Sequence, residues 1–340
     1  MSTPVIAVYG AYGHTGRLVA AELRSRNQNV ILGGRDAGAL DVMGAELGYP
    51  VHPAPLDDPA ALRELSQQAD VLIHCAGPFT VTGEPVATAC VETECHYVDH
   101  AVEPHHVRRL FEDFQRRVQS TGIAMVPGMS LYGGIGDLLA DAVADGLHGI
   151  DRVTTAYAVS GRQANNGARE TAARLFAEAE RITYTGGEFQ IGYVRPRNVV
   201  FAFPPPIGPR TMIAPFPSCE IVTIPRHVPA RTVEALFTAD TFTERQVLVG
   251  EQAGTAGRGR SEFTVAAQVI AAHGSRAGRV TGTDPRRAGA LACVEAALRL
   301  MEVPSKAGVL SPAEAFPADV LLRALERLGA FTLTIERRAP

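Results

Sequence analysis

Three glycines near the start of the chain are the first candidates for chemistry, because they directly follow an apolar run. Gly10, Gly13 and Gly16 stand between apolar residues 5–9 and a segment with helical periodicity. At a strand–turn–helix junction, glycines permit a tight turn, close approach of backbone N–H groups to a pyrophosphate, and close packing of helix on strand. The amino end of the helix adds partial positive charge. The motif predicts a dinucleotide-binding turn; a glycine-rich turn without a ligand is the alternative.

The tip of the second predicted strand carries an arginine where an acidic residue is usual. Its sequence is VILGGRD, so Gly33 and Gly34 occupy the place of the Asp or Glu that binds the ribose 2′-hydroxyl of NAD, and Arg35 follows. A guanidinium pairs well with a 2′-phosphate, and a hydrogen bond to a charged group contributes roughly 1.5–3 kcal/mol. We therefore expect NADP(H) as the cofactor. Asp36 is expected to begin the next helix and point away.

Four residues are candidates for the proton transfer that accompanies a hydride reaction. Tyr97, Asp99 and His100 lie in the segment HYVDH, where alternation places Tyr97 and Asp99 on one face of a strand. Tyr132 lies in the glycine-rich bend GMSLYGG. Tyrosine, histidine, a carboxyl group or water can each supply a proton. Structural roles for Tyr97 and Asp99, a solvated position for His100 and hinge packing for Tyr132 are the alternatives.

Other chemistries find little support in the sequence. Lys306 is the only lysine, and Glu302 stands where the tyrosine of a Tyr-x-x-x-Lys dyad would be. A serine nucleophile elbow at Ser130 would need glycine in the place of Tyr132. The cysteines and histidines of residues 90–106 match no common zinc spacing, so we expect no metal.

The bulk composition indicates an ordinary globular chain of 340 residues, with 46% apolar residues, 20% charged residues and a net charge of −4. Neither sign forms a long block, so nucleic acid and anionic membranes are poor candidate partners. No apolar run approaches the ~20 residues that span a bilayer. The first residues show no signal-peptide pattern, and the five cysteines show no C-x-x-C pair. We expect a cytoplasmic protein with a small-molecule or acyl-type substrate; a homodimer is left open.

The elements that would position these residues alternate strand and helix over residues 1–128, which is typical of βαβ units. Strands are expected at residues 5–9, 30–33, 51–54, 71–75, 97–99 and 123–126, and helices at 15–26, 37–47, 59–68, 85–94 and 104–120. This order predicts an α/β fold with a doubly wound parallel Rossmann sheet.

From residue 129 the pattern becomes α+β, which predicts a substrate domain over residues 129–302. Its expected elements are helices 137–145, 169–181 and 286–301, a strand at 153–160, short β segments up to residue 229, and a hairpin of 263–273 and 279–282 around residues 274–278. No second glycine-rich strand–helix turn follows. The tail, residues 303–340, contains an expected helix at 312–328 and strand at 331–335, and should pack back on the first domain.

Several blocks of the sequence resemble the saccharopine dehydrogenase-like reductases, including the branch known as trans-acting enoyl reductases. The blocks, in the family's order, are GAYGHTGR, GGRD, CAGPF, TGEPVATAC, HYVD, VPGM with GDLLAD, and GVLSPAEAF. The resemblance covers the first domain and the C-terminal part, with a diverged middle. It implies a Rossmann domain with an α/β substrate domain, using NADP(H) to reduce C=N or C=C bonds.

The resemblance also implies roles for single residues. The pyrophosphate would be cradled by the turn that contains Gly10, Ala11, Tyr12, Gly13, His14, Thr15 and Gly16. Arg35 would meet the 2′-phosphate, and Ala76, Gly77 and Pro78 would border the nicotinamide. Tyr12 and His14 replace commoner residues of the family's turn, and Arg286 stands where relatives often have tyrosine.

The segment CAGPF supports the same conclusion from its residues alone. A strand at the switch point that ends in small residues leaves room for a cofactor beyond its carboxyl end, although a rigid turn is the alternative. The sequence thus predicts an NADPH-dependent reductase of an imine C=N or activated enoyl C=C bond, with secondary metabolism as one setting. A non-catalytic NADP(H)-binding regulatory or scaffold protein is the alternative.

Overall fold

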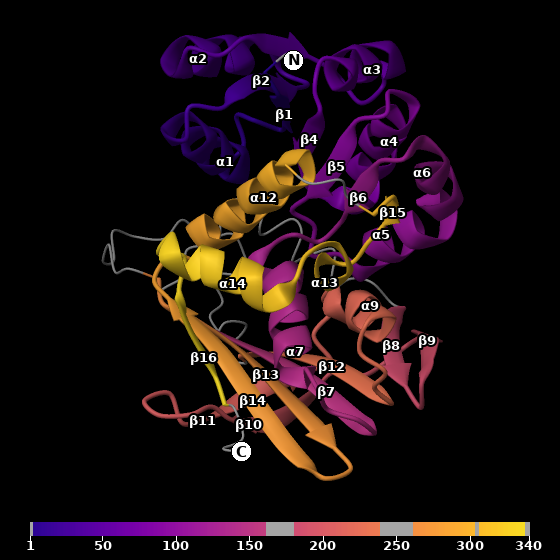
Figure 1. Cartoon of the computed structure of the whole chain (residues 1–340), viewed down its shortest axis with the longest axis vertical. Coiled ribbons are helices and arrows are strands. Elements are labelled where there is room, and N and C mark those ends of the chain that lie inside the picture. Colours follow the sequence, from indigo (N-terminus) through magenta and orange to yellow (C-terminus); the bar gives the residue numbers. More distant parts are fainter. Residues whose placement is uncertain (1–2, 161–179, 239–260, 303–305, 337–340) are drawn as a thin grey trace. The chain divides into compact units, whose positions relative to one another are not determined.

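The computed structural model describes residues 3–160, 180–238, 261–302 and 306–336, which form two compact units (Figure 1). The first unit comprises Met1–Gly134 and Arg286–Pro317, and the second comprises Ile135–Pro285 and Ala318–Pro340. Each unit has its own sheet and its own hydrophobic core. This division differs from the predicted boundaries at residues 128 and 302. Contacts between residues distant in the sequence place Arg286–Pro317 in the first unit and Ala318–Pro340 in the second.

The first unit is built on a parallel sheet with the strand order β15-β6-β5-β4-β1-β2-β3. Its strands are β1 (Val5–Tyr9), β2 (Asn29–Gly34), β3 (Val51–Pro53), β4 (Val71–His74), β5 (His96–Asp99), β6 (Ala124–Val126) and β15 (Gly308–Val309). The order reverses direction between β1 and β4, which confirms the doubly wound prediction. β15 was not predicted, because two residues are too few to show any periodicity.

Helices cover both faces of this sheet. They are α1 (His14–Ser25), α2 (Ala37–Leu47), α3 (Pro59–Gln67), α4 (Phe79–Glu92), α5 (Pro104–Arg109), the π-helical turn η1 (Leu110–Phe114) and α6 (Gln115–Thr121). Helix α4 begins six residues before the predicted start at Pro85, which lies inside it. The carboxylate of Glu103 accepts a hydrogen bond from the backbone N–H of Phe79 at 3.0 Å, so the helix start is stabilised by a residue far along the chain.

Helix α12 (Pro285–Glu302) falls almost wholly in the first unit, although the sequence placed it in the substrate domain. Arg26, the C-cap of α1, forms an ion pair with Glu295, and the thiol of Cys293 donates to the carbonyl of Met129 at 2.8 Å. Such pairs join residues far apart in the sequence and leave no local pattern.

The second unit contains, within the described residues, a mixed sheet in the order β10-β11-β12-β7-β13-β14-β16, with β8 paired to β12 and β9 to β8. Its strands are β7 (Ile150–Val159), β8 (Arg181–Thr185), β9 (Glu188–Gly192), β10 (Arg197–Ala202), β11 (Pro209–Ala214), β12 (Thr232–Thr238), β13 (Phe263–Ala271), β14 (Gly274–Gly282) and β16 (Thr332–Ile335). The predicted hairpin is present, with a tighter turn after residue 271. Most of the predicted helix 169–181 lies outside the described residues.

Helix α7 (Gly136–Ala144) packs on β13 and β14 of this sheet (Figure 1). The C-terminal segment is shared between the units: α13 (Pro312–Ala315) lies in the first, whereas α14 (Ala318–Arg327) packs on α7. The predicted helix 312–328 is broken because Pro317 forces the preceding residue into an extended conformation. The tail therefore does not pack back on the first unit as a whole, since β16 pairs with β14.

Candidate nucleotide site

The glycine turn, residues 10–16, joins β1 to α1 and leaves no room for a side chain at Gly10 or Gly16. Gly10 has a positive φ of 78°, and its N–H donates to the carbonyl of Gly33 at 2.9 Å. A Cβ at Gly16 would lie 2.3 Å from the carbonyl oxygen of Gly10 and 2.6 Å from that of Ala11. The turn therefore holds the amino end of α1 tightly against the carboxyl end of β1, as a dinucleotide requires.

The amino end of α1 suits an anion. The helix begins at His14 with Gly13 as its N-cap, and no side-chain hydrogen bond to this cap is found within the described residues. The first turn contains no acidic residue. Its backbone N–H groups and the helix dipole therefore favour a negatively charged group, and the residues present fit a pyrophosphate.

The tip of β2 presents Arg35 to solvent, beyond the end of the strand. Asp36 accepts from the N–H of Ala39 at 3.0 Å and caps α2, which confirms its predicted position. Burial, together with the nearby Tyr12, raises the pKa of Tyr9 to about 12, against an opposing effect of the Arg35 charge. The charge of Arg35 thus acts at Tyr9, the last residue of β1, which directly precedes the glycine turn.

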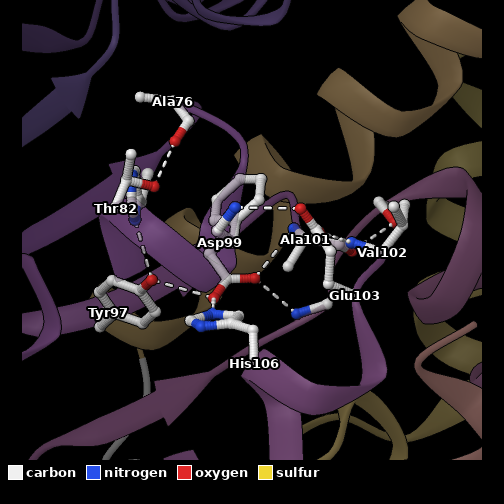
Figure 2. Close-up of polar contacts among 12 residues, drawn as sticks. Ala76, Thr82, Tyr97, Asp99, Ala101, Val102, Glu103 and His106 are labelled. Carbon is white, nitrogen blue, oxygen red and sulfur yellow. Dashed lines mark hydrogen bonds and ion pairs between the residues drawn. The ribbon is translucent and has the colours of Figure 1, made fainter. Parts of the chain in front are cut away.

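The segment after β4, residues 76–78, directly adjoins the glycine turn. A Cβ at Gly10 would lie 2.7 Å from the Cβ of Ala76. The hydroxyl of Thr82 donates to the carbonyl of Ala76 and ties this segment to the first turn of α4 (Figure 2). The Gly77–Pro78 peptide bond is cis. Two turns from the neighbouring strands β1 and β4 thus meet at the switch point of the sheet, where doubly wound domains bind their ligands.

Beside these turns, the carboxylate of Asp99 is the centre of a fully buried hydrogen-bond network, the Asp99 network (Figure 2). One oxygen accepts from the backbone N–H groups of Gly128 at 2.7 Å and Ala101 at 3.0 Å. The other accepts from the hydroxyl of Tyr97 at 2.9 Å and lies 2.7 Å from Nε2 of His106. The network ties the end of β5 to the bend after β6.

The pKa values of the network's members determine which group donates in each hydrogen bond. Burial raises the pKa of Asp99, but His106 and the backbone N–H groups outweigh it and hold the pKa below its usual value. Because an ionised carboxylate only accepts, Tyr97 donates to it, and the oxygen of Tyr97 accepts from Nδ1 of His74 at 3.0 Å. Burial lowers the pKa of His74 to about 3, so this histidine is neutral.

The structure separates the four predicted proton-transfer residues into two pairs. Tyr97 and Asp99 share one network, as their common strand face predicted, but both are fully buried. His100 and Tyr132 are half-buried. Burial lowers the pKa of His100 to about 4, so it is neutral near pH 7, and its Nδ1 lies 3.5 Å from the thiol of Cys293.

Sequence reasoning missed three members of the site: His74, His106 and Glu103. A histidine inside the apolar run VLIHCAG was a usable signal for His74, since a buried polar side chain requires a partner. His106 and Glu103 gave no local signal, because their partners, Asp99 and Phe79, lie on other elements.

The cysteines and histidines of residues 90–106 have separate surroundings. Cys90 and Cys95 are buried among apolar side chains, and Nδ1 of His96 accepts from the N–H of Ala124 at 2.9 Å. In the part of the chain that the structure describes, no three His, Cys, Asp or Glu side chains gather as they do around a metal ion. Likewise, none of the described helices is long and apolar enough to cross a membrane.

Comparison with known proteins supports a nucleotide-binding role for the first unit. Residues 6–126 match the family model of the saccharopine dehydrogenase NADP-binding domain. A saccharopine dehydrogenase-like oxidoreductase of Arabidopsis thaliana is 29% identical over 138 residues, covering 36% of this chain and 30% of that protein. A trans-acting enoyl reductase of Mycobacterium ulcerans is 30% identical over 128 residues, covering 36% and 31%. The matches thus span about a third of the length of these relatives.

The fold extends the likeness over the whole chain. Apo saccharopine dehydrogenase (L-Glu forming) of Saccharomyces cerevisiae superimposes with a TM-score of 0.70 at 13% identity, covering 99% of this chain and 100% of that one. The predicted family resemblance and the NADP-binding nature of the first domain are confirmed. The Arabidopsis relative carries a mitochondrial designation, so the cytoplasmic location stays a prediction. Residues 6–126 thus match the saccharopine dehydrogenase NADP-binding domain, and the whole chain has the fold of saccharopine dehydrogenase.

Proposed function

We propose that this protein is an NADPH-dependent oxidoreductase that reduces a C=N or activated C=C bond of a small-molecule or carrier-bound substrate. The observation that supports it most directly is the contact between the glycine turn and Ala76, where a Cβ at Gly10 would meet the Cβ of Ala76 at 2.7 Å. This contact lies at the switch point between β1 and β4, beyond the carboxyl ends of the strands. Both named relatives are oxidoreductases.

The proposed cofactor site follows from the two turns and the β2 tip. The pyrophosphate is bound by the turn of Gly10, Ala11, Tyr12, Gly13, His14, Thr15 and Gly16 at the amino end of α1. Arg35 binds the 2′-phosphate as a charged hydrogen-bond donor. Ala76, Gly77 and Pro78 border the nicotinamide, which supplies a hydride when NADPH is bound.

The four predicted proton-transfer residues take two roles in this proposal. Tyr97 and Asp99 are positioning residues, because they are fully buried and join the end of β5 to the bend at Gly128. His100 and Tyr132 are the candidates for contact with substrate, since both are half-buried. Neutral His100 retains one N–H, and Tyr132 retains its phenol, so either can donate to the atom that does not receive hydride.

A non-catalytic NADP(H)-binding protein is the second candidate function. The burial of Tyr97 and Asp99 favours it, because two of the four predicted proton donors cannot reach a substrate without rearrangement. Binding of NADPH without turnover would distinguish it from the reductase.

The test is NADPH consumption by the purified full chain with a cyclic imine or an enoyl thioester, followed by nicotinamide absorbance. We expect Tyr132→Phe or His100→Gln to lower kcat by about 10²–10⁴-fold with unchanged NADPH affinity, because general acid catalysis contributes that much. Tyr193→Phe is the matched control, since Tyr193 is 78% exposed and belongs to the second unit. If NADPH binds but neither substrate consumes it, the reductase proposal is contradicted; if both variants keep full activity, the donor is water or another residue.

A further inference from the structure

A second arginine lies at the glycine turn, supplied from the far end of the sequence. Nη1 of Arg286 in α12 lies 3.3 Å from Nε2 of His14, the first residue of α1. The two residues are 272 positions apart. The amino end of α1 is where the dinucleotide motif places a pyrophosphate, so this cation stands beside the expected anion.

The position of Arg286 is held by an anchored helix. Further along α12, Glu295 pairs with Arg26, the C-cap of α1, and lies 3.5 Å from Arg299. Both side chains of the Arg26–Glu295 pair are mostly buried, with 18% and 13% of their surface exposed. Arg26 also pairs with Glu22 at 2.8 Å. Because α12 is a continuous helix, its ion pair with Arg26 restricts where Arg286 lies.

The contact with His14 also determines the direction of its hydrogen bond. A guanidinium only donates, so Nε2 of His14 accepts and His14 carries its proton on Nδ1. The five N–H donors of a guanidinium can bind a histidine and a phosphate oxygen together. Arginine forms short, charge-assisted hydrogen bonds with phosphates, often through two N–H groups.

We propose that Arg286 is a ligand of the cofactor's pyrophosphate, so that two arginines from opposite ends of the sequence divide the cofactor's charges. This inference rests on the proposed NADPH site. Arg35, at the tip of β2, meets the 2′-phosphate, which only NADPH carries. Arg286, at the amino end of α1, meets the pyrophosphate, which NADPH and NADH share. Arg286 therefore raises affinity for both cofactors, whereas Arg35 discriminates between them.

The experiment compares Arg286→Gln with the neighbouring control Arg287→Gln, using NADPH, NADH, ADP-ribose and adenosine 2′-monophosphate as probes. ADP-ribose carries the pyrophosphate without the 2′-phosphate, and adenosine 2′-monophosphate carries the reverse. By titration calorimetry we expect Arg286→Gln to weaken NADPH, NADH and ADP-ribose by the same factor, about 10- to 150-fold, and to leave adenosine 2′-monophosphate unchanged. Arg287→Gln should change none of them by this much, since Arg287 is exposed beside the site.

Each other outcome has a distinct meaning. If the wild-type chain binds NADPH, and Arg286→Gln binds ADP-ribose as tightly as the wild type does, the Arg286 assignment is wrong and the proposed cofactor site is retained. A change confined to the NADPH-to-NADH ratio would also overturn it, because it would place Arg286 at the 2′-phosphate. Failure of the wild-type chain to bind either dinucleotide contradicts the proposed function itself. If Arg286→Gln does not fold, Arg286→Lys is measured in its place. Its affinity for ADP-ribose should be reduced by less than that expected for Arg286→Gln, because lysine retains the positive charge but not the bidentate geometry of the guanidinium.

Discussion

Two fully buried carboxylates, one in each unit, have opposite protonation preferences. Asp99 in the first unit lies beside His106 and accepts from two backbone N–H groups. Glu220, in helix α9 (Glu220–Thr223) of the second unit, accepts from the hydroxyls of Tyr157 and Ser218. The first set of donors holds the pKa of Asp99 below its usual value, despite burial. Burial raises the pKa of Glu220 to about 7, and the hydroxyls only partly offset it.

The difference shows that the partners of a buried carboxylate decide its charge. Both side chains have no exposed surface, so desolvation disfavours ionisation in each. A nearby histidine and N–H dipoles stabilise a negative charge more than hydroxyl groups do. Asp137, also fully buried, adds its negative charge near Glu220 and raises the pKa further. Asp99 is therefore an ionised anchor, whereas Glu220 changes charge near neutral pH.

A third group in the second unit extends the comparison. His227 lies between two carboxylates of α7, with Nε2 at 2.9 Å from Asp137 and Nδ1 at 3.0 Å from Asp141. Burial lowers the pKa of His227, but the two carboxylates outweigh it and raise the pKa to about 10. The charge of Asp137 thus has a positive partner, whereas the side-chain donors to Glu220 are hydroxyl groups.

The largest expected effect comes from removing the partner of Asp99. His106→Ala should lower the free energy of unfolding by about 1.5–3 kcal/mol, because the buried Asp99 carboxylate loses one of its four hydrogen-bond partners. Urea unfolding at pH 7 measures it, with His148→Ala as the control, since His148 is exposed and surface substitutions stay within about 0.5 kcal/mol. A loss below about 1 kcal/mol would mean that Asp99 is not held as a charge.

The next largest expected effect is a pH dependence of the free energy of unfolding between pH 4.5 and 7, to which Glu220 contributes and Asp99 does not. The pKa of Glu220 is about 7 in the folded state, which is above its value in the unfolded chain. Between these two pKa values the folded state binds a proton that the unfolded state has lost. The free energy of unfolding therefore falls as the pH rises towards 7. The slope is about 1.4 kcal/mol per pH unit for one group. Glu220→Gln should remove this slope, measured by urea unfolding across pH 4.5–7 in steps of about half a unit.

The control for that slope is Asp99→Asn. Because the folded pKa of Asp99 is depressed, its contribution is present above the unfolded pKa of about 3.9 and is lost only as pH falls through the folded value. Asp99→Asn should therefore leave the slope of stability between pH 4.5 and 7 unchanged, whereas Glu220→Gln should remove the contribution of Glu220 to it. An unchanged slope in Glu220→Gln would show that Glu220 is already ionised at low pH.

The smallest expected effect is that of one hydroxyl beside Glu220. Thr155 donates to Glu220 at 3.3 Å, and Thr155→Val should cost about 0.5–1.5 kcal/mol at pH 7. Since the lost hydrogen bond stabilises the ionised form, the pH at which the Glu220 slope ends should also move upward. Thr154→Val, on the opposite face of β7, is the matched control. Equal effects of the two variants would contradict the role given to the hydroxyls.

Local signals in the sequence predicted the parts of the site that lie within one strand–turn–helix unit. The three glycines, the arginine at the β2 tip and the capping role of Asp36 are of this kind. The alternation of Tyr97 and Asp99 predicted their common face, but not that both side chains are fully buried there. Periodicity reports which residues share a face, whereas burial depends on what packs there.

The remaining parts depend on contacts between segments distant in the sequence. The N–H of Gly128 and the carboxylate of Asp99 are 29 residues apart, and Arg26 and Glu295 are 269 apart. No window of neighbouring residues contains both partners of such a pair. For the same reason, the sequence assigned α12 to the wrong unit.

We propose that the first unit binds NADPH through Arg35 at the tip of β2. The most direct measurement is titration of the wild-type chain and Arg35→Ala with NADPH and NADH, followed by nicotinamide fluorescence. We predict that the wild type prefers NADPH by about 10- to 150-fold, and that Arg35→Ala loses this preference with its NADH affinity unchanged. The same ratio of dissociation constants in wild type and Arg35→Ala would contradict the assignment of the 2′-phosphate to this arginine.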